Sequence, residues 1–204
     1  MRRAVIVSLE WRPNDPDFSL SGSILVASRH LADPNFFRTV LLILEHGNGA
    51  LGVVLNRPTA LTIADAVPNW AGLVAKPAVV FQGGPVERTA AIGLARPSGA
   101  FYPDQSWFSL SIREPGRELG IVNLGAEPSD LAGVVRDVRI FSGYAGWTAG
   151  QLEGEIQAGG WLVLDHEAFD PLTSDPATLW NQASSAAASG QGVRAIDGPL
   201  VQDN

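Results

Sequence analysis

Glu45 and His46 form the pair of neighbouring residues best suited to acid–base chemistry in this chain. A carboxylate beside an imidazole can serve as a general base or can orient one. Adjacent side chains of a β-strand point to opposite faces, so a structural role is favoured: a polar end to a buried strand and a hydrogen bond that closes a hairpin.

Arg57, in Asn56-Arg57-Pro58, can bind a carboxylate or phosphate in two-pronged fashion, or can pair with Glu45 across that hairpin. The sequence alone does not fix the register that decides between these two roles.

Two glycine-rich segments have the composition of ligand-binding turns. Residues 47–52 match the letters of the dinucleotide pattern G-x-G-x-x-G, but that pattern needs a helix to begin at its glycines, and a β-branched strand follows here. We therefore expect a hairpin turn at Gly47-Asn48-Gly49. Gly83 and Gly84 end another strand. Adjacent glycines let a backbone approach a ligand closely or present amides to an anion, although a tight turn is the favoured interpretation.

An aromatic and glycine-rich segment, Phe141-Ser142-Gly143-Tyr144-Ala145-Gly146-Trp147, precedes an expected helix. A strand that leads through glycines and aromatic residues into a helix N-terminus is typical of ligand-facing loops. Tyr144 and Trp147 can equally be core anchors that the glycines allow to pack. Both interpretations remain open.

Several classes of chemistry are excluded by composition. The chain has no cysteine, so disulfides, thiol nucleophiles and iron–sulfur ligation are ruled out. It also lacks the H-E-x-x-H and Walker patterns, and Ser142 is not in a G-x-S-x-G elbow. We expect neither a metal nor a cofactor.

The charge balance and hydropathy also limit the partners. The net charge is −7 and the pI is near 4.9, which disfavours direct DNA binding because phosphates need a positive face. No apolar run approaches the ~18 residues of a membrane helix, and the apolar stretch that begins at Ala4 stops at Ser8, too short for an export signal. We expect a cytoplasmic protein that does not enter the membrane and binds an unidentified small molecule or protein.

Short strands dominate the expected secondary structure. The expected strands are Ser23–Ala27, Val40–Leu44, Ala50–Asn56, Ala78–Gln82, Ala90–Ala95, Phe108–Ile112, Leu119–Leu124, Val138–Tyr144 and Leu162–Leu164. Val40–Leu44 is apolar throughout, which fits a strand buried on both faces, whereas Phe108, Leu110 and Ile112 alternate with serines and should form one buried face.

Helices are fewer and shorter. A helical pattern over residues 63–70 should bend or break at Pro68, and Pro128-Ser129-Asp130 should start a short helix. Thr148 and Gln151 form a capping box for a helix that ends near Gln157, and Asp175-Pro176 should cap a last helix that runs to Ala188.

These elements predict an α+β fold: a single compact domain with a strongly curved mixed β-sheet flanked by a few short helices. We expect the domain to span residues 19–189. Residues 1–18 should form a flexible N-terminal arm, and residues 190–204 a flexible C-terminal tail.

An ordered set of short motifs resembles the YqgE/AlgH family of small bacterial proteins, over most of the chain from about Leu20 to Trp180. The motifs are Ala32-Asp33-Pro34-Asn35-Phe36, Glu45-His46, Gly49-Ala50-Leu51-Gly52, Asn56-Arg57-Pro58, Gly83-Gly84-Pro85-Val86, Gly143-Tyr144-Ala145-Gly146-Trp147, Gln151–Ile156, Gly160-Trp161 and Leu179-Trp180. Each motif is weak alone, but their order is specific.

The resemblance implies a compact α+β fold around a highly curved sheet, a cytosolic protein and a family label of transcriptional regulator, with no settled biochemical activity. A ligand groove in such a protein would map to Glu45, His46, Asn56, Arg57, Gly83, Gly84, Tyr144 and Trp147. We therefore expect a regulatory protein that binds a ligand or partner. The alternative is an enzyme of unknown reaction that uses Glu45 and His46 as acid and base and Arg57 to bind an anion.

Overall fold

The computed structural model describes residues 7–10, 19–29, 31, 33–98, 107–110, 118–131, 133–165 and 170–197. The strands are β1 (Val7–Glu10), β2 (Ser23–Ala27), β3 (Val40–Gly47), β4 (Gly49–Val54), β5 (Pro58–Thr62), β6 (Val79–Gln82), β7 (Val86–Pro97), β8 (Trp107–Ser109), β9 (Gly120–Val122), β10 (Val135–Trp147), β11 (Trp161–Asp165) and β12 (Arg194–Asp197). The helices are η1 (Pro34–Phe36), α1 (Ile63–Ala66), η2 (Pro68–Trp70), α2 (Pro128–Leu131), α3 (Gln151–Gln157) and α4 (Leu179–Ala188), where η marks a 3-10 turn.

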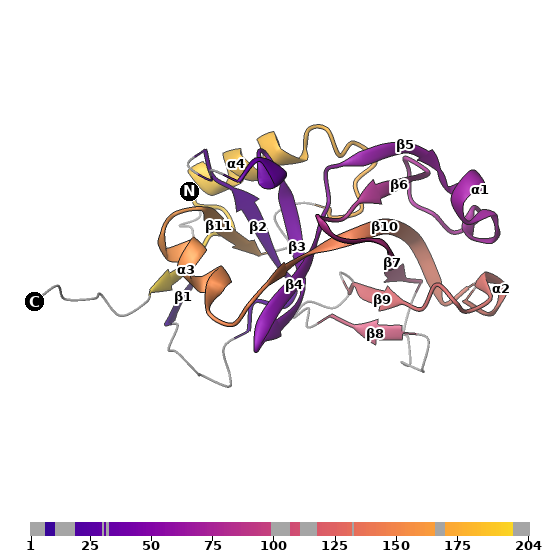
Figure 1. Cartoon of the computed structure of the whole chain (residues 1–204), viewed down its shortest axis with the longest axis horizontal. Helices are drawn as coiled ribbons and strands as arrows, with labels where there is room; N and C mark the ends of the chain where they lie inside the picture. The colour runs from indigo at the N-terminus through magenta and orange to yellow at the C-terminus, as the bar shows by residue number, and fades with distance from the viewer. Residues whose placement is uncertain are drawn as a thin grey trace, which may run out of the picture.

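One strongly curved sheet of ten strands forms the body of the molecule (Figure 1). Its strand order is β11-β2-β3-β4-β10-β7-β9-β8, and β5 and β6 join beside β10. Neighbouring strands are antiparallel except for β10 and β6, which run parallel. The expected α+β class, with one curved mixed sheet and short helices, is confirmed.

The left part of the sheet in Figure 1 is buried on both faces. Alternate residues of β3 enter two different clusters: Val40, Leu42 and Leu44 pack in the core under α4, and Leu41 and Ile43 pack in the core under α3. Such a strand is apolar at every position because neither face meets water. The expectation for Val40–Leu44 is therefore confirmed.

The right part of the sheet has its own core. Ile63 of α1 and Trp70 of η2 pack with Leu131 of α2 and with Val138 and Ile140 of β10. These helical turns are too short to be stable alone, so their burial against the sheet must hold them.

The two parts meet where β10 changes its partner. Residues before Gly143 pair with β6 and β7, and residues 145–147 pair with β4. Gly83 links the parts at this point: its N–H donates to the Ser142 carbonyl (2.9 Å), and its carbonyl accepts from Val54 N–H (2.8 Å). A Cβ atom on Gly83 would lie 2.2 Å from the Gly143 carbonyl oxygen, and one on Gly84 would lie 2.1 Å from the Tyr144 carbonyl carbon. Only glycine allows this approach.

A buried arginine ties β10 to two loops. The Arg139 guanidinium donates to the carbonyls of Lys76 (2.7 Å), Thr173 (2.9 Å), Pro171 (3.3 Å) and Leu172 (3.3 Å), and lies 4.3 Å from the centroid of the Phe81 ring. Burial lowers the pKa of this side chain to about 10, an effect that the Asp170 carboxylate opposes and Arg96 reinforces. Arg139 therefore acts as a structural cation at the core.

Most of the expected elements are present. The hairpin turn, the break at Pro68 and the short helix at Pro128 are confirmed. At Thr148 the backbone N–H donates to the side chain of Gln151 (3.1 Å), which is one half of the expected capping box, but Gly150 occupies the N-cap position itself.

Three details of the expectation are wrong. The last helix begins at Leu179 with Thr178 as its N-cap, so Asp175-Pro176 lies in the turn before it and does not cap it. Phe108 is 63% exposed, and Trp107 beside it is buried instead, although Leu110 is buried as expected and Ile112 lies outside the described residues. The strand β5 was not expected at all.

The predicted chain ends lie partly outside the described residues. Within them, β1 and β12 pair with each other in parallel, which brings segments from the predicted arm and tail side by side. The division into arm, domain and tail remains a prediction.

We expect Gly84→Ala to destabilise the fold by about 3 kcal/mol or more, because the new methyl group would overlap backbone atoms of β10. Gly154→Ala in α3 is the matched control, since no atom lies within 4 Å of its Cβ position. It should stabilise the protein by about 0.5–1 kcal/mol. Urea unfolding of both variants tests this, and similar midpoints for the two would contradict it.

We expect Arg139→Met to lower the free energy of unfolding by about 3 kcal/mol, because it leaves buried carbonyls without a donor. Arg139→Lys should recover only part of this loss, since one ammonium group cannot reproduce the guanidinium fork. Arg136→Met, at an exposed position of the same strand, should change stability by about 0.5 kcal/mol or less. Chemical denaturation distinguishes the three variants, and equal effects at positions 136 and 139 would refute the assigned role.

Candidate functional site

The structure places the eight expected site residues in three separate regions. Glu45, His46 and Trp147 lie at the turn end of the β3–β4 hairpin, and Asn56 and Arg57 lie at its opposite end. Gly83, Gly84 and Tyr144 lie at the point where β10 changes partner. Asn56 is bonded to Val40 at the start of β3, and His46 lies six residues further along that strand, which is about 20 Å at ~3.3 Å per residue.

At the turn end, His46 is bound to a carboxylate of α3. Its Nε2 lies 3.0 Å from Oε1 of Glu153, and the two side chains are only 4% and 10% exposed. Glu45 is exposed, so the two neighbours do differ in environment as expected. The pair has the composition of an oriented imidazole, but its burial leaves little surface for a substrate, and its visible effect is to attach the hairpin to α3.

A second carboxylate, Glu155, lies within an aromatic cluster at the same end. Its Oε2 accepts hydrogen bonds from the indole N–H of Trp147 (3.0 Å) and of Trp161 (2.7 Å), and its Oε1 accepts from Gln151 (3.0 Å). The Phe36 ring packs on both indoles, with centroids 6.2 Å from Trp147 and 5.5 Å from Trp161. Trp147 is therefore a core anchor, which is one of the two interpretations that its sequence left open. Glu155 was not expected to matter.

At the other end of the hairpin, Asn56 organises the chain before β3. Its Oδ1 accepts from Val40 N–H (3.0 Å), and its Nδ2 donates to the Arg38 carbonyl (2.9 Å). Arg57 donates from Nη2 to the Phe37 carbonyl at 3.5 Å. Partial burial lowers the pKa of Arg57, and the Asp33 carboxylate opposes that effect.

The hairpin register excludes an Arg57–Glu45 pair, which is one of the two roles that the sequence left open for Arg57. Glu45 faces Leu51 across the hairpin, and Arg57 lies beyond Val54, which faces Leu41. The acid–base pair and the anion-binding arginine of the enzymatic alternative therefore lie at opposite ends.

Gly83 and Gly84 serve the crossing with β10. The Gly83 amide is bonded to the Ser142 carbonyl, so it is not offered to an anion. Tyr144 is half-buried and packs against the core beneath α4.

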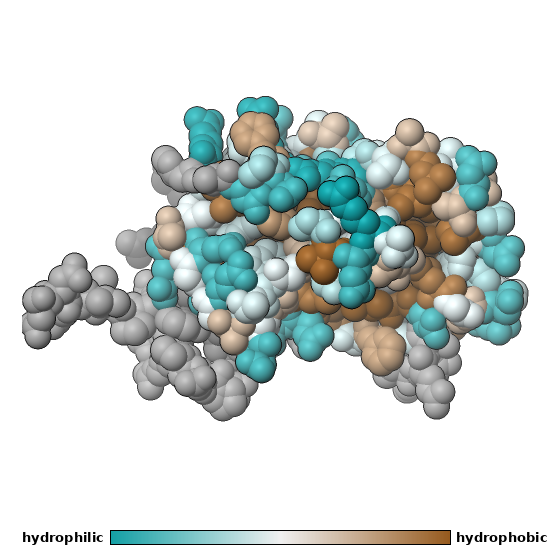
Figure 2. Space-filling model, in the orientation of Figure 1, coloured by the Kyte–Doolittle hydropathy of each residue, from teal (hydrophilic) through white to brown (hydrophobic). Residues whose placement is uncertain are grey.

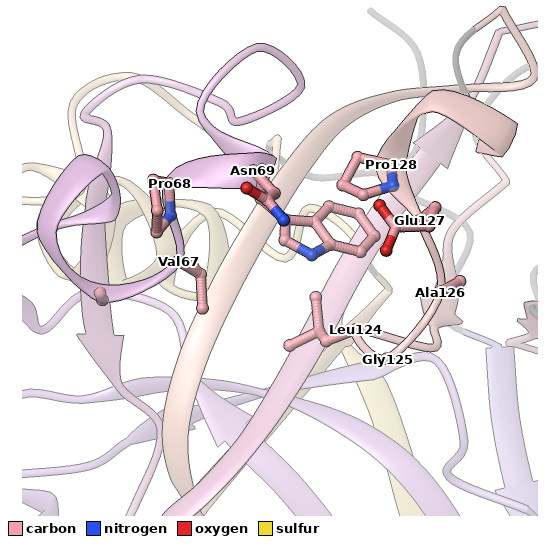
Figure 3. A pocket seen from close by; sticks show the side chains of 10 residues that line it. Val67, Pro68, Asn69, Leu124, Gly125, Ala126, Glu127 and Pro128 are labelled. Carbon is pink, nitrogen blue, oxygen red and sulfur yellow. The ribbon is translucent and has the colours of Figure 1, made fainter.

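A pocket of about 390 Å³ lies elsewhere, and none of the eight residues lines it. We call it the Trp70 pocket. It lies between the α1–η2 segment and the chain that leads into α2, and its lining is Ala66, Val67, Pro68, Asn69, Trp70, Leu124, Gly125, Ala126, Glu127 and Pro128. In Figure 3, Asn69 lies on one wall, Glu127 lies on the other with its carboxylate turned toward the space, and Leu124 lies between them. Sequence reasoning missed it because its walls are more than fifty residues apart in the chain.

Metal sites and membrane-spanning helices each require a particular pattern of residues in the structure. In the part of the chain that it describes, no group of three or more His, Asp or Glu side chains is placed to hold a metal ion. The same residues contain no helix with the length and apolar character to span a bilayer.

We expect Glu155→Ala to destabilise the protein by about 2–3 kcal/mol, because two indole N–H groups lose their acceptor inside the core. Glu155→Gln should cost less, since its amide oxygen can still accept from them. Glu45→Gln, at an exposed position of the same region, is the control and should have little effect. Unfolding followed by tryptophan fluorescence measures all three, and a Glu155→Ala variant as stable as Glu45→Gln would contradict the assignment.

Comparisons with known proteins agree with the motif resemblance. A family model described as AlgH-like (DUF179) matches residues 24–189. A UPF0301 protein of Streptomyces avermitilis is 46% identical over 165 residues, covering 80% of this chain and 84% of that protein. A UPF0301 protein of Mycobacterium tuberculosis (strain H37Ra) is 44% identical over 163 residues, covering 79% of each chain.

Solved structures show the same fold. A crystal structure of a protein from Corynebacterium diphtheriae matches with a TM-score of 0.69 and 28% identity, covering 84% of this chain and 88% of that one. The solution structure of the AlgH protein from Pseudomonas aeruginosa matches with a TM-score of 0.55 and 32% identity, covering 90% and 94%. The fold, the ordered motifs and these matches together place the chain in the AlgH-like (UPF0301) family.

Proposed function

We propose that this protein binds a small molecule in the Trp70 pocket and acts as a binding protein rather than as a catalyst. The observation that carries the proposal is the pocket itself, a hollow of about 390 Å³ that is lined by both apolar and polar groups, including the side chains of Asn69 and Glu127. Ligand sites in proteins have this form: apolar surface supplies the affinity, and a few polar groups set the orientation.

The lining suggests the chemistry of the ligand. Val67, Pro68, Leu124 and Pro128 offer an apolar surface, and the Glu127 carboxylate at the wall favours a hydrogen-bond donor or a positive group. A small amine with an apolar body fits this combination. Binding would also join α1–η2 to the start of α2, two short segments that pack side by side in the same core.

Binding is favoured over catalysis because the expected catalytic groups are far apart. His46 is occupied by Glu153, and Arg57 lies about 20 Å away at the other end of β3. A general base and an anion-binding group must both reach one substrate.

A regulatory role is part of the same proposal, at the level of the family label. With a net charge of −7, the chain suits a ligand-dependent change in contact with a protein partner better than direct contact with DNA. A cysteine-free chain also fits the reducing cytoplasm, which we propose as its location.

A thermal-shift screen of small amines and neutral apolar compounds tests the proposal. A ligand present at 100 times its dissociation constant stabilises the folded state by about 2.7 kcal/mol, which is a shift of roughly 5–10 °C for a chain of this size. We expect compounds with an amine to be selected, and their shift to fall in Asn69→Ala and in Glu127→Gln.

Asn48→Ala and Glu45→Gln, both at exposed positions of the hairpin, are the controls. They should leave the ligand-induced shift unchanged. Shifts that persist in Asn69→Ala and Glu127→Gln but disappear in the hairpin variants would contradict the assignment to the Trp70 pocket.

A further inference from the structure

Two arginines and an exposed phenylalanine gather where η1 leads into β3. We call Phe37, Arg38 and Arg57 the arginine corner. Arg57 reaches it from the end of β4, and its Nη2 lies 3.5 Å from the Phe37 carbonyl. Figure 2 shows strongly hydrophilic residues over the region of η1 on this face of the molecule. The chain has a net charge of −7, so two neighbouring arginines form a locally positive region on an otherwise acidic protein.

The hydrogen-bonding capacity of both guanidinium groups is largely unused. Each arginine carries five N–H donors. Among the described residues, Arg38 makes contacts with aromatic rings, its Cζ lying 4.8 Å from the Trp180 centroid and 5.7 Å from the Phe37 centroid, and no hydrogen bond from its side chain is observed. Arg57 makes one long hydrogen bond there. The corner therefore holds N–H groups that can donate hydrogen bonds to the oxygens of a phosphate.

The backbone presents Arg38 in a fixed and strained form. Its φ is +53°, a region that non-glycine residues seldom adopt. Asn56 holds both flanks through the Arg38 carbonyl and Val40 N–H, and Thr39 bonds back to the Phe36 carbonyl (2.8 Å). Strain that the surroundings maintain at a charged surface residue is a feature of binding sites.

The electrostatic environment favours an added anion. Arg57 is partly withdrawn from water, so its charge is screened less than that of a fully exposed arginine. Asp33 is the acidic group that acts on it, and the Asp33 side chain is already bonded to Asn35 N–H at the start of η1. One carboxylate against two guanidinium groups leaves a net positive corner.

The aromatic ring narrows the class of anion. Phe37 is 66% exposed, although phenylalanine is usually buried. Its ring lies 5.7 Å from the Arg38 guanidinium, and its backbone carbonyl accepts from Arg57. An open aromatic ring next to arginines is the arrangement that proteins use to stack a base and bind its phosphate. The overall negative charge works against a long polyanion, so a single nucleotide fits better than a nucleic acid strand.

We propose that the arginine corner is a binding site for a mononucleotide, with the phosphate on Arg38 and Arg57 and the base on Phe37. The site is separate from the Trp70 pocket and does not depend on the proposed function of that pocket.

Titration of the full chain with AMP, followed by calorimetry and by tryptophan fluorescence, tests the proposal, because Trp180 contacts Arg38. Arg57→Gln should weaken AMP binding about tenfold through loss of the bidentate donor. Phe37→Ala should weaken it about fivefold through loss of stacking, and should leave the binding of ribose 5-phosphate unchanged. Arg88→Gln and Leu61→Ala, at exposed positions elsewhere, are the matched controls and should bind AMP as the parent does.

Fragments of AMP show how much of the affinity comes from the base and how much from the phosphate. Adenosine and inorganic phosphate should each bind more weakly than AMP. No AMP binding at millimolar concentration, or binding that Arg57→Gln and Phe37→Ala leave intact, would overturn the proposal. Tighter binding of a ten-nucleotide single strand than of AMP, with a steep salt dependence, would overturn the mononucleotide assignment in favour of nucleic acid.

Arg38→Gly separates recognition from folding. Glycine adopts a φ of +53° without strain, so this variant removes the guanidinium and the strain together. We expect its melting temperature to stay within about 3 °C of the parent, while its affinity for AMP falls at least about fivefold. Retained AMP affinity with a large loss of melting temperature would show that Arg38 serves stability, and would overturn its place in the site.

Discussion

The close crossing of Gly83 and Gly84 over β10 is the constraint on which the rest of the fold depends. At this point β10 leaves β6 and β7 and joins β4, and Gly83 bonds to both sides through Ser142 and Val54. The backbones approach so closely that a Cβ atom would overlap main-chain atoms. The absence of side chains thus sets how the two parts of the curved sheet meet, and with it the direction of the β3–β4 hairpin. The glycines therefore affect the fold at a distance, through the strands that they position.

The hairpin that leaves this crossing keeps two different polar regions apart. Its turn end is locked to α3 through His46 and Glu153, beside a Glu155 carboxylate enclosed by indoles. Its other end carries Asn56 and Arg57, where donors remain available and an aromatic ring is exposed. Because β3 is buried on both faces, it acts as a stiff spacer between the two. The motif residues at the two ends of one hairpin therefore stand in different surroundings, locked to α3 at one end and partly exposed at the other.

Local patterns predicted the elements well, and long-range placement poorly. The unbroken apolar run Val40–Leu44 and the Gly47–Gly49 turn have strong local causes, and both were found as expected. Phe108 was misassigned although Leu110 of the same pattern is buried, because on the short edge strand β8 alternation alone does not decide which apolar side chains are covered. The exposed β5 was missed because it has no apolar pattern to signal it. The eight site residues were grouped by type, and only the register of the hairpin and the partner change in β10 could show that they lie apart.

Three arginines differ in how many hydrogen bonds their guanidinium groups make within the protein. Arg139 is 2% exposed, and its guanidinium reaches four backbone carbonyls and a phenylalanine ring. Its Nε is without a hydrogen-bond partner among the described residues, but it is buried, so a ligand could not reach it. Arg38 and Arg57 stand at the surface with rings and one long hydrogen bond as the contacts seen among the described residues. If Arg38 served only to fill its position, glycine would adopt the φ of +53° there without strain. The retained charge and strain are accounted for most simply by an anion that binds from outside.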